Sequence, residues 1–434
     1  MQAHNGHPPF FFRPRITRLR PQLCGRVAAS LVALALSAPG WAAPKSPEQA
    51  STLPQLPQVA QDVASPSAQV RRQALRALRE RGGPETLPLL AGLVGDAEID
   101  IREGAVAGVI DIYVHPLMNR SAGSAAVAFE AARLHDQPWP APPELSTVLV
   151  KALADEQPSV RRDAAYAVGI VLTRPVTDAV AFELLASLSD REPSVRVAAA
   201  RALGRLGVQD AGVPLVGRVN DEDLEVRLAS MRALGDLRYK PAMMALTDQF
   251  RFYVRGVAGR SAISALAAIG HPSTIPLFEA QTTSGYPAHR WAAYEGLARS
   301  GGAAAAAPRI EAAMVSEKDT RVLNAMAFAL ASAGRDGVNR VLDALTDDDR
   351  TDDALAYLVE LGQPHVKTLA ARLSDSNPLV RGQIATALGF IGGPEAVAAL
   401  KGASGESDPD VRQRIGVAQL RLTRPRMAPA TGAP

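Results

Sequence analysis

Cysteine is almost absent from this sequence, and its absence limits the available chemistry. The chain has a single cysteine, Cys24, which lies within an N-terminal segment that we expect to be removed. Cys24 also precedes the apolar run of that segment, whereas the lipid-accepting cysteine of a lipoprotein follows such a run. The remaining chain would form no disulfide, hold no thiolate-bound metal and use no thiol nucleophile. Such a chain is compatible with an oxidising compartment.

Aromatic residues are also scarce: they make up 5% of the 434 residues, although 47% are hydrophobic. Most of the apolar residues are alanine, leucine and valine. A core of small side chains favours closely packed helices over a sandwich with aromatic layers. The alternation of apolar and polar residues that is typical of strands is nearly absent. We therefore predict an all-α protein.

Motifs for catalysis and cofactor binding are missing as well. The sequence contains no His-Glu pair, no His-x-x-x-His step, no phosphate-binding loop of the Walker type and no Gly-x-Ser-x-Gly. It therefore predicts no catalytic, cofactor-binding or metal-ligating residues and no cofactor. The alternative is an enzyme, or a carrier of a small ligand or metal, built on a scaffold whose site has no recognisable motif.

The first 42 residues have the layout of a secretory signal peptide. Five arginines and no acidic residue precede an uncharged run at residues 27–38, and small residues follow as far as Ala42. The run is about a dozen residues long, whereas a membrane-spanning helix needs roughly 20. We predict export to the periplasm or the medium of a bacterial cell, with no stable membrane span after cleavage. An uncleaved anchor or a buried helix is the alternative.

Positive charge outside this segment is balanced by acidic residues. The formal net charge is +3, and removing the five arginines of residues 1–42 leaves −2. A surface that follows a phosphate backbone needs a concentrated basic face. We therefore expect no nucleic-acid partner, although a local basic patch could survive this average.

A unit of roughly 30 residues recurs from residue 67 onwards. Segments 155–161, 190–196 and 375–381 all read Asp-x-x-Pro-x-Val-Arg, and each leads into an alanine-rich stretch. With the arginine as anchor, successive units lie 28 to 35 residues apart, except for one gap of 59. The anchors fall at residues 71, 102, 161, 196, 227, 259, 290, 323, 351, 381 and 412; the three that are not arginine are Gly259, Leu323 and Thr351.

Each unit contains the apolar pattern of two short helices. In the unit that starts at Pro193, apolar residues recur at steps of three and four as far as Leu206, and a second apolar stretch follows at residues 213–219. Proline suits the first position of a helix, and Gly207 suits its end. Two such helices cannot bury their apolar faces alone, but stacked neighbours can.

The repeated segments resemble the short HEAT-like repeat associated with phycobilisome lyases, over about residues 67–420. We therefore expect an α-solenoid of about ten to eleven two-helix HEAT-like repeats, stacked into a right-handed superhelix with the second helices lining its concave side. The resemblance implies little about activity, because the family includes scaffolds, adaptors and a few enzymes. The HEAT-repeat deoxyhypusine hydroxylases hold iron through His-Glu pairs, which this sequence lacks.

In five units an aspartate precedes the anchor arginine by six residues. In HEAT-like families such residues form a ladder of hydrogen bonds between adjacent repeats, so the resemblance implies a structural role here. A guanidinium group could also bind a carboxylate or phosphate of a ligand, but a ligand site would not need every copy. The predicted ladder residues are Asp96, Arg102, Asp155, Arg161, Asp190, Arg196, Asp221, Arg227, Asp375 and Arg381.

Irregular parts of the array are candidates for binding a partner. The gap of 59 residues predicts an irregular insertion at about residues 113–145, either a degenerate unit or a loop inserted into one repeat, in which Trp139 lies among prolines. Two later units contain aromatic clusters, with Arg251 and Arg255 in the first. Each aromatic residue could contact a partner or fill an irregular junction in the core. The candidate partner-binding residues are Trp139, Phe250, Phe252, Tyr253, Tyr286 and Trp291.

The sequence thus predicts a signal peptide at residues 1–42, a flexible leader rich in Pro, Gln and Ser at 43–66, a solenoid at 67–423 and a disordered tail at 424–434. A solenoid offers a long, shallow contact area rather than a closed pocket. We therefore predict an exported scaffold or adaptor, not an enzyme, that binds a protein or peptide partner on its concave face.

Overall fold

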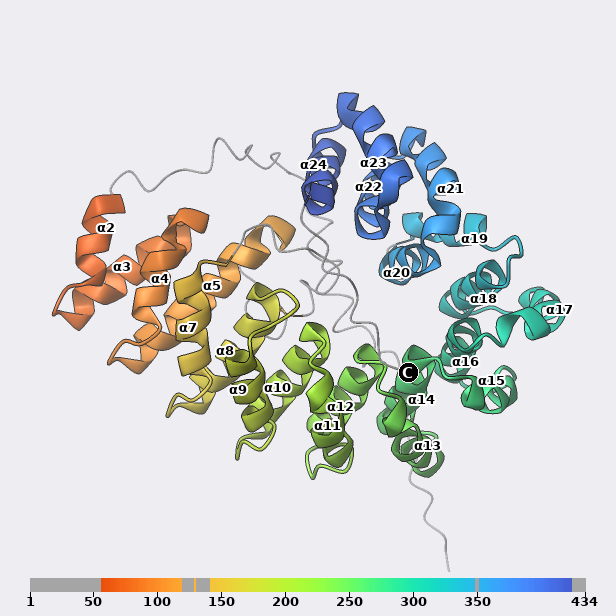
Figure 1. The fold of residues 1–434 in the computed structure, drawn as a ribbon, viewed down its shortest axis with the longest axis horizontal. Helices are drawn as coiled ribbons and strands as arrows, with labels where there is room; N and C mark the ends of the chain where they lie inside the picture. The colour runs from red at the N-terminus through yellow and green to blue at the C-terminus, as the bar shows by residue number, and fades with distance from the viewer. Residues whose placement is uncertain (1–55, 119–128, 130–140, 348–350, 424–434) are drawn as a thin grey trace, which may run out of the picture. The chain divides into compact units, whose positions relative to one another are not determined.

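The computed structural model describes residues 56–118, 129, 141–347 and 351–423. The predicted signal peptide, most of the leader, the tail and Trp139 lie outside these residues. The described part of the chain consists of α-helices and short 3-10 turns without any strand, which confirms the predicted all-α solenoid (Figure 1). Within it, no helix combines the length and the apolar character needed to span a bilayer.

Every predicted anchor lies in the first turn of a longer helix. These helices, which we call the long helices, are α3 (Ala68–Arg81), α5 (Ile99–Met118), α8 (Pro158–Val171), α10 (Pro193–Leu206), α12 (Leu224–Asp236), α14 (Val257–Ile269), α16 (Pro287–Ser300), α18 (Thr320–Ser332), α20 (Thr351–Leu361), α22 (Pro378–Ile391) and α24 (Pro409–Thr423).

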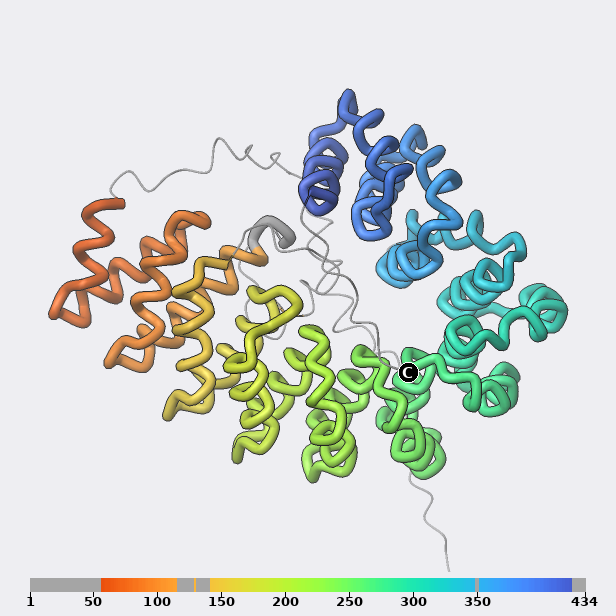
Figure 2. Tube along the Cα trace, viewed as in Figure 1, coloured from red at the N-terminus to blue at the C-terminus, as the bar shows by residue number. Residues whose placement is uncertain are grey.

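The second helix of most units is shorter, and a 3-10 turn precedes several of them. These short helices are α4 (Leu87–Leu93), α7 (Pro143–Ala152), α9 (Asp178–Ser187), α11 (Gly212–Arg218), α13 (Met243–Phe252), α15 (Ile275–Gln281), α17 (Ala303–Met314), α19 (Val338–Asp343), α21 (Val366–Ala371) and α23 (Gly393–Gly402). The two-helix units follow one another in chain order (Figure 2).

Local chemistry explains where a unit begins and ends. Helix α10 starts at Pro193, where the missing N–H leaves no hydrogen bond unmade. It ends at Gly207, which has a φ of 69°. In this left-handed conformation the N–H of Gly207 donates to Gly204 O, and the N–H of Val208 donates to Leu203 O, both at 3.1 Å.

The long helices form the more tightly packed layer of the stack. Helix α10 packs along both α8 and α12, whereas α9 and α11 make fewer contacts with their equivalents (Figure 1). The approach is close: a Cβ atom at Gly204 would lie 2.8 Å from Ala233 Cα. In a curved array the tightly packed layer is the concave one. The prediction that the second helices line the concave side is therefore wrong.

Two predicted boundaries also differ from the structure. Part of the predicted flexible leader forms helix α2 (Leu56–Val63). This helix is ordered because Val59 packs into the core beside α3. Helix α5 continues to Met118, so the irregular insertion starts later than residue 113.

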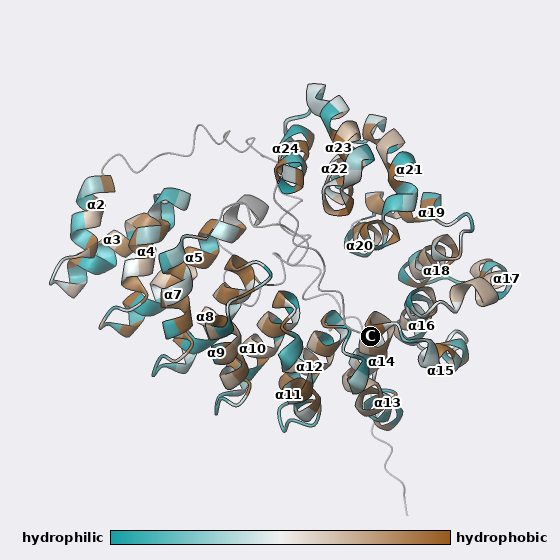
Figure 3. Ribbon diagram, in the orientation of Figure 1, coloured by the Kyte–Doolittle hydropathy of each residue, from teal (hydrophilic) through white to brown (hydrophobic). Residues whose placement is uncertain are grey.

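Hydrophobic residues concentrate on the helices, and the connecting turns are largely hydrophilic (Figure 3). An apolar turn is therefore an exception in this protein.

Candidate partner-binding surface

A regular link between two units joins an anchor arginine to two different turns. Arg196 donates from Nη1 to the backbone oxygen of Asp190, in its own unit, at 2.9 Å. Its Nε and Nη2 donate to the carboxylate of Asp221, in the next unit, at 3.1 and 2.7 Å. The side chains of this pair are only 6% and 2% exposed. The arginine thus connects the start of α10 to the turn that precedes α12.

The same geometry recurs at five further links: Arg71 with Asp96, Arg102 with Asp155, Arg161 with Asp190, Arg290 with Glu317, and Arg381 with Glu406. An acidic residue therefore accepts from the arginine of the preceding unit. The arginine of its own unit also binds its backbone, except at Glu317, whose unit has Leu323 at the anchor position. The hydrogen bonds from Arg290 and Arg381 lower the pKa values of Glu317 and Glu406 to about 2. Six links of one kind favour a structural role.

Two of the predicted ladder residues lack the contact between arginine and carboxylate that links adjacent units. Arg227 donates from Nη1 to the backbone oxygen of Asp221 at 2.9 Å, but its buried Nε has no partner among the described residues. Asp375 forms an ion pair with Arg372, three residues earlier in the chain, at 3.0 Å. The reason is that Thr351, not arginine, occupies the anchor position of the unit before Asp375.

The first break in the ladder lies between α12 and α14. Tyr253 stands six residues before the anchor position, where regular units have an acid, and Gly259 is the anchor. A Cβ atom at Gly259 would lie 2.1 Å from the backbone oxygen of Tyr253, so this turn leaves no room for an arginine. Arg227 therefore has no carboxylate to reach, and no arginine continues the ladder to the next unit.

Large apolar side chains are exposed at this break. Phe252 is 79% exposed, and Tyr286, in the next turn along the array, is 45% exposed. Phe252 lies edge-on to Tyr253, with ring centroids 4.6 Å apart. We call the exposed apolar residues of this region the aromatic turn: Phe252, Tyr253, Val254, Val257 and Tyr286.

A buried histidine joins the two segments of the aromatic turn. His289 is 1% exposed, its ring centroid lies 5.2 Å from that of Tyr286, and it is hydrogen-bonded to the backbone of Val254. Burial, together with the charge of Arg260, lowers the pKa of His289, so the ring is neutral at pH 7. Arg251, Arg255 and Arg260 are exposed in the same segment, and residues 249–260 include no acid.

A second break, between α18 and α20, has a different structure. Leu323 and Thr351 occupy the two anchor positions, and Leu345 stands where the acid would be. The hydroxyl group of Thr351 donates to the backbone oxygens of Leu345 and Asp347 at 3.2 and 2.8 Å. Thr351 thus contacts backbone oxygens at the start of its helix, as the anchor arginine does in regular units.

Buried polar side chains connect the helices around the second break. Tyr357 of α20 donates to Glu295 of α16 at 2.8 Å and accepts from Nε1 of Trp291 at 2.8 Å. Arg299 forms ion pairs with Glu295 at 3.3 Å and with Glu360 at 3.0 Å. Burial raises the pKa of Tyr357 well above its ordinary value, so the hydroxyl remains a donor. We call these residues the α16–α20 network.

Comparison with protein families identifies the repeat. HEAT repeats are matched over residues 181–261, 256–331 and 338–420, which together are more than half of the chain. The chain belongs to the HEAT-repeat family.

Comparison with solved structures gives matches of low sequence identity. The complex of CpcE and CpcF of phycocyanin lyase from Nostoc sp. PCC7120 is 21% identical over 64% of this chain and 94% of its own, with a TM-score of 0.38. Kap121p bound to Ste12p is 14% identical over 87% of this chain and 45% of its own, with a TM-score of 0.37. No curated protein matches the sequence.

In the structure, some of the predicted partner-binding residues are exposed and others are buried. Phe252, Tyr253 and Tyr286 are exposed together, whereas Phe250 is 5% exposed and packs edge-on against His289. Phe250 is thus a core residue, so its assignment as a partner contact is wrong. Trp291 belongs to the α16–α20 network and lies beneath Arg321, whose Cζ is 4.4 Å from the ring centroid.

The other members of the α16–α20 network were not predicted from the sequence. Glu295, Arg299, Tyr357 and Glu360 match no motif, and 62 residues separate Tyr357 from Glu295. The only signal in the sequence was the loss of the anchor arginines at Leu323 and Thr351, which marks where a substitute contact is needed.

Proposed function

We propose that this HEAT-repeat protein is an exported scaffold or adaptor that binds another protein, and that the aromatic turn contacts the partner. The observation that carries the proposal is the exposure of Phe252, Tyr253 and Tyr286 where the ladder is interrupted. The surface lies on the turns that precede α14 and α16, not on the face formed by the second helices. We propose binding rather than catalysis.

Energetics support a partner at this surface. Burying a phenylalanine side chain is favourable by about 1.5–3 kcal/mol, and Phe252 gains almost none of this in the isolated chain. The unit also lacks two links of the ladder. Aromatic and arginine side chains are the residues most often found at the energetic centre of protein interfaces. A partner that buries the rings and brings acidic side chains to Arg251 and Arg255 would complement the surface.

Capture of a partner by matched variants tests this proposal. The tagged full chain and its Phe252→Ser/Tyr286→Ser variant are used to capture proteins from the cell envelope of the source bacterium. The control is Phe182→Ser, since Phe182 of α9 is 69% exposed but lies away from the aromatic turn. We expect one partner to be retained by the wild type and the control and lost by the double variant.

Thermal unfolding accompanies the capture experiment. Removing exposed rings should change the free energy of unfolding by less than about 0.5 kcal/mol, so loss of the partner would not reflect misfolding. If the double variant keeps the partner, or if Phe182→Ser loses it equally, the aromatic turn is not the contact surface.

Export is the second part of the proposal, and it rests on residues 1–42. Cell fractionation followed by N-terminal sequencing tests it directly. We expect the protein in the periplasm or the medium with Ala43 as its first residue. Recovery of the uncleaved chain from the cytoplasm would contradict export.

A further inference from the structure

The segment that contains the aromatic turn is almost free of acidic residues. Residues 249–294 include one acid, Glu279, and its carboxylate accepts a hydrogen bond from Arg309, outside the segment. The chain without residues 1–42 has a formal net charge of −2, so this local shortage of acid is unusual for the protein. The arginines of the segment are Arg251, Arg255, Arg260 and Arg290.

Three of these four arginines have no partner for their charge in the described part of the chain. Arg290 binds Glu317 as part of the ladder. Arg251, Arg255 and Arg260 are exposed, and no carboxylate or other acceptor contacts their guanidinium groups among the described residues. Unpaired cations therefore lie beside the exposed rings of the aromatic turn.

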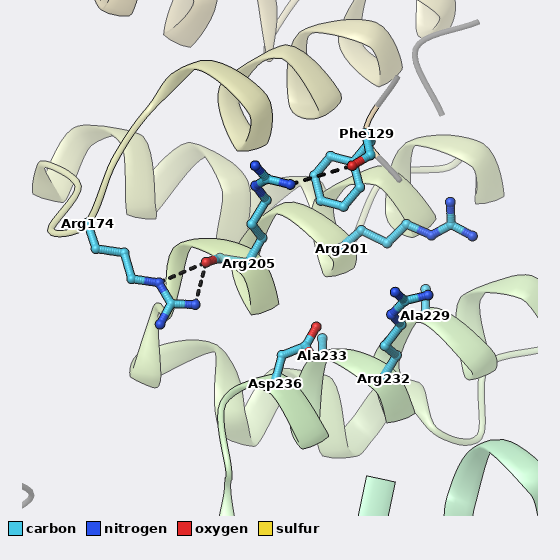
Figure 4. A pocket seen from close by; sticks show the side chains of 8 residues that line it. All are labelled: Phe129, Arg174, Arg201, Arg205, Ala229, Arg232, Ala233 and Asp236. Atoms are coloured by element: carbon cyan, nitrogen blue, oxygen red, sulfur yellow. Dashed lines mark hydrogen bonds between the residues drawn. The ribbon is translucent and has the colours of Figure 1, made fainter. Parts of the chain in front are cut away.

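Clustering of arginines does not by itself leave them unpaired in this protein. Arg174, Arg201 and Arg232 line a cavity between α10, α12 and the turn that follows α8 (Figure 4). The Nε of Arg174 donates to the backbone oxygen of Arg205 at 2.8 Å, and Arg201 and Arg232 also interact with groups of the chain. At the aromatic turn, by contrast, the described residues supply no such groups.

Helix stability does not explain the arginines of the aromatic turn. Arg255 and Arg260 lie at the N-terminal end of α14, where the positive end of the helix dipole disfavours cations. One unit earlier, α12 has acidic residues at this end: Asp223 accepts a hydrogen bond from the N–H of Val226, and Glu225 lies in the first turn. Local electrostatics favour acid here, so the unpaired arginines need another explanation.

The exposed side chains indicate which groups a partner must carry. A guanidinium group matches the two oxygens of a carboxylate. Phe252 is 79% exposed, and the other members of the aromatic turn are 36–45% exposed, so they form a surface against which an apolar side chain can pack. The surface therefore complements a partner that combines carboxylates with at least one apolar side chain.

The neighbouring turn limits the extent of this partner. Residues 221–225, before α12, include four acids, and α12 packs against α14. The side chain of Glu222 is 89% exposed. An anionic membrane or a nucleic acid would extend over these acids and be repelled, because like charges brought together are unfavourable. A short acidic segment can occupy the aromatic turn without covering them.

We propose that the partner presents a short peptide segment in which carboxylates flank an apolar side chain. The carboxylates bind Arg251 and Arg255, and the apolar side chain packs against Phe252 and Tyr286. This inference rests on the proposed function, because both use the aromatic turn, and it adds the chemical class of the partner.

Fluorescence anisotropy of a labelled peptide tests the inference on the full chain. The probe has phenylalanine and leucine between runs of glutamate; two control peptides carry glutamine for glutamate, or serine for the two apolar residues. The protein variant is Arg251→Gln/Arg255→Gln, which keeps every ring of the aromatic turn. The matched control is Arg191→Gln/Arg340→Gln, which removes the same charge from exposed arginines elsewhere.

The glutamate peptide should bind saturably, and Arg251→Gln/Arg255→Gln should weaken its binding at least about tenfold, which corresponds to about 1.4 kcal/mol. Both control peptides should bind the wild type at least about tenfold more weakly than the probe. The control variant should stay within about twofold of the wild type, because salt screens exposed charges that lie far apart.

Reversal of the charges gives a second readout that misfolding cannot imitate. Arg251→Glu/Arg255→Glu should lose the glutamate peptide and bind a peptide with lysine in place of glutamate more tightly than the wild type does. Failure of the reversed variant to gain the lysine peptide would contradict pairing at these two positions.

Four further results would overturn the proposal. They are the absence of saturable binding, equal binding of the glutamine peptide, equal weakening by Arg251→Gln/Arg255→Gln and its control, and tighter binding of phosphatidylglycerol vesicles than of the glutamate peptide.

The capture experiment distinguishes failure of this inference from failure of the proposed function. If Arg251→Gln/Arg255→Gln keeps a captured partner that Phe252→Ser/Tyr286→Ser loses, the aromatic turn binds a protein, but the acidic segment is wrong. If both variants keep the partner, the aromatic turn is not the contact surface, and both proposals are wrong.

Discussion

The two breaks in the arginine ladder are structurally opposite. At the second, between α18 and α20, the α16–α20 network replaces the missing ion pairs with buried hydrogen bonds. At the first, between α12 and α14, the Nε of Arg227 has no partner among the described residues and Phe252 is 79% exposed. A compensated break is explained by stability alone. Stability does not explain the first break, where no substitute contact replaces the missing links among the described residues. This difference distinguishes a candidate binding surface from an irregular core.

Removing one regular link should have the largest effect on stability. Arg196→Ala is expected to reduce the free energy of unfolding by about 2–4 kcal/mol, because it leaves the buried carboxylate of Asp221 without its main partner. Denaturant unfolding followed by circular dichroism measures the change. Arg191→Ala, on an exposed neighbour, is the control, and an unchanged value for Arg196→Ala would show that the ladder does not stabilise the stack.

The α16–α20 network should stabilise its break almost as strongly. Tyr357→Phe keeps the ring but removes the hydroxyl group that connects Trp291 and Glu295, and we expect a loss of about 2 kcal/mol. The same unfolding measurement applies. Tyr239→Phe serves as the control, since no hydrogen bond of its hydroxyl group is found among the described residues. Equal effects of the two substitutions would contradict the compensating role of the network.

Acidification should weaken regular links. The pKa of Glu317 is about 2 in the folded chain, below its ordinary value of 4.5, because Arg290 donates to the carboxylate. The stabilisation is therefore complete above about pH 4.5 and is lost as the pH falls towards 2. We expect the melting temperature to fall over this window, and to fall less steeply in Glu317→Gln. Identical pH profiles would rule out a contribution from this link.

Adding the missing link at the first break should raise the free energy of unfolding slightly. Tyr253→Asp places a carboxylate in the register that Asp221 occupies one unit earlier, within reach of Arg227, and we expect about 1 kcal/mol of added stability. Tyr253→Asn is the matched neutral variant, and unfolding of both in the Arg227→Met background isolates the pair. If the aspartate and asparagine variants are equally stable, the carboxylate does not reach Arg227. The aspartate variant should also lose the partner, since it removes a ring from the aromatic turn.

The sequence predicted the repeated unit because its signals are local. Proline at the start of α10, apolar residues on one face and Gly207 at its end lie within 15 residues of one another. The repetition of Asp and Arg also indicated a ladder. It did not show that Arg196 binds the carboxylate of Asp221 in the next unit while contacting only the backbone of Asp190 in its own.

Tertiary structure alone decided which aromatic and basic residues form sites. Phe250 and Phe252 are two residues apart, yet one is 5% exposed and the other 79%, because successive positions on a helix point in different directions and the neighbouring unit covers only one of them. Trp291 and Tyr357, or Arg201 and Arg232, meet through stacking of separate units. A repeat pattern determines each unit by itself, whereas a site between units depends on the side chains that the stack brings together.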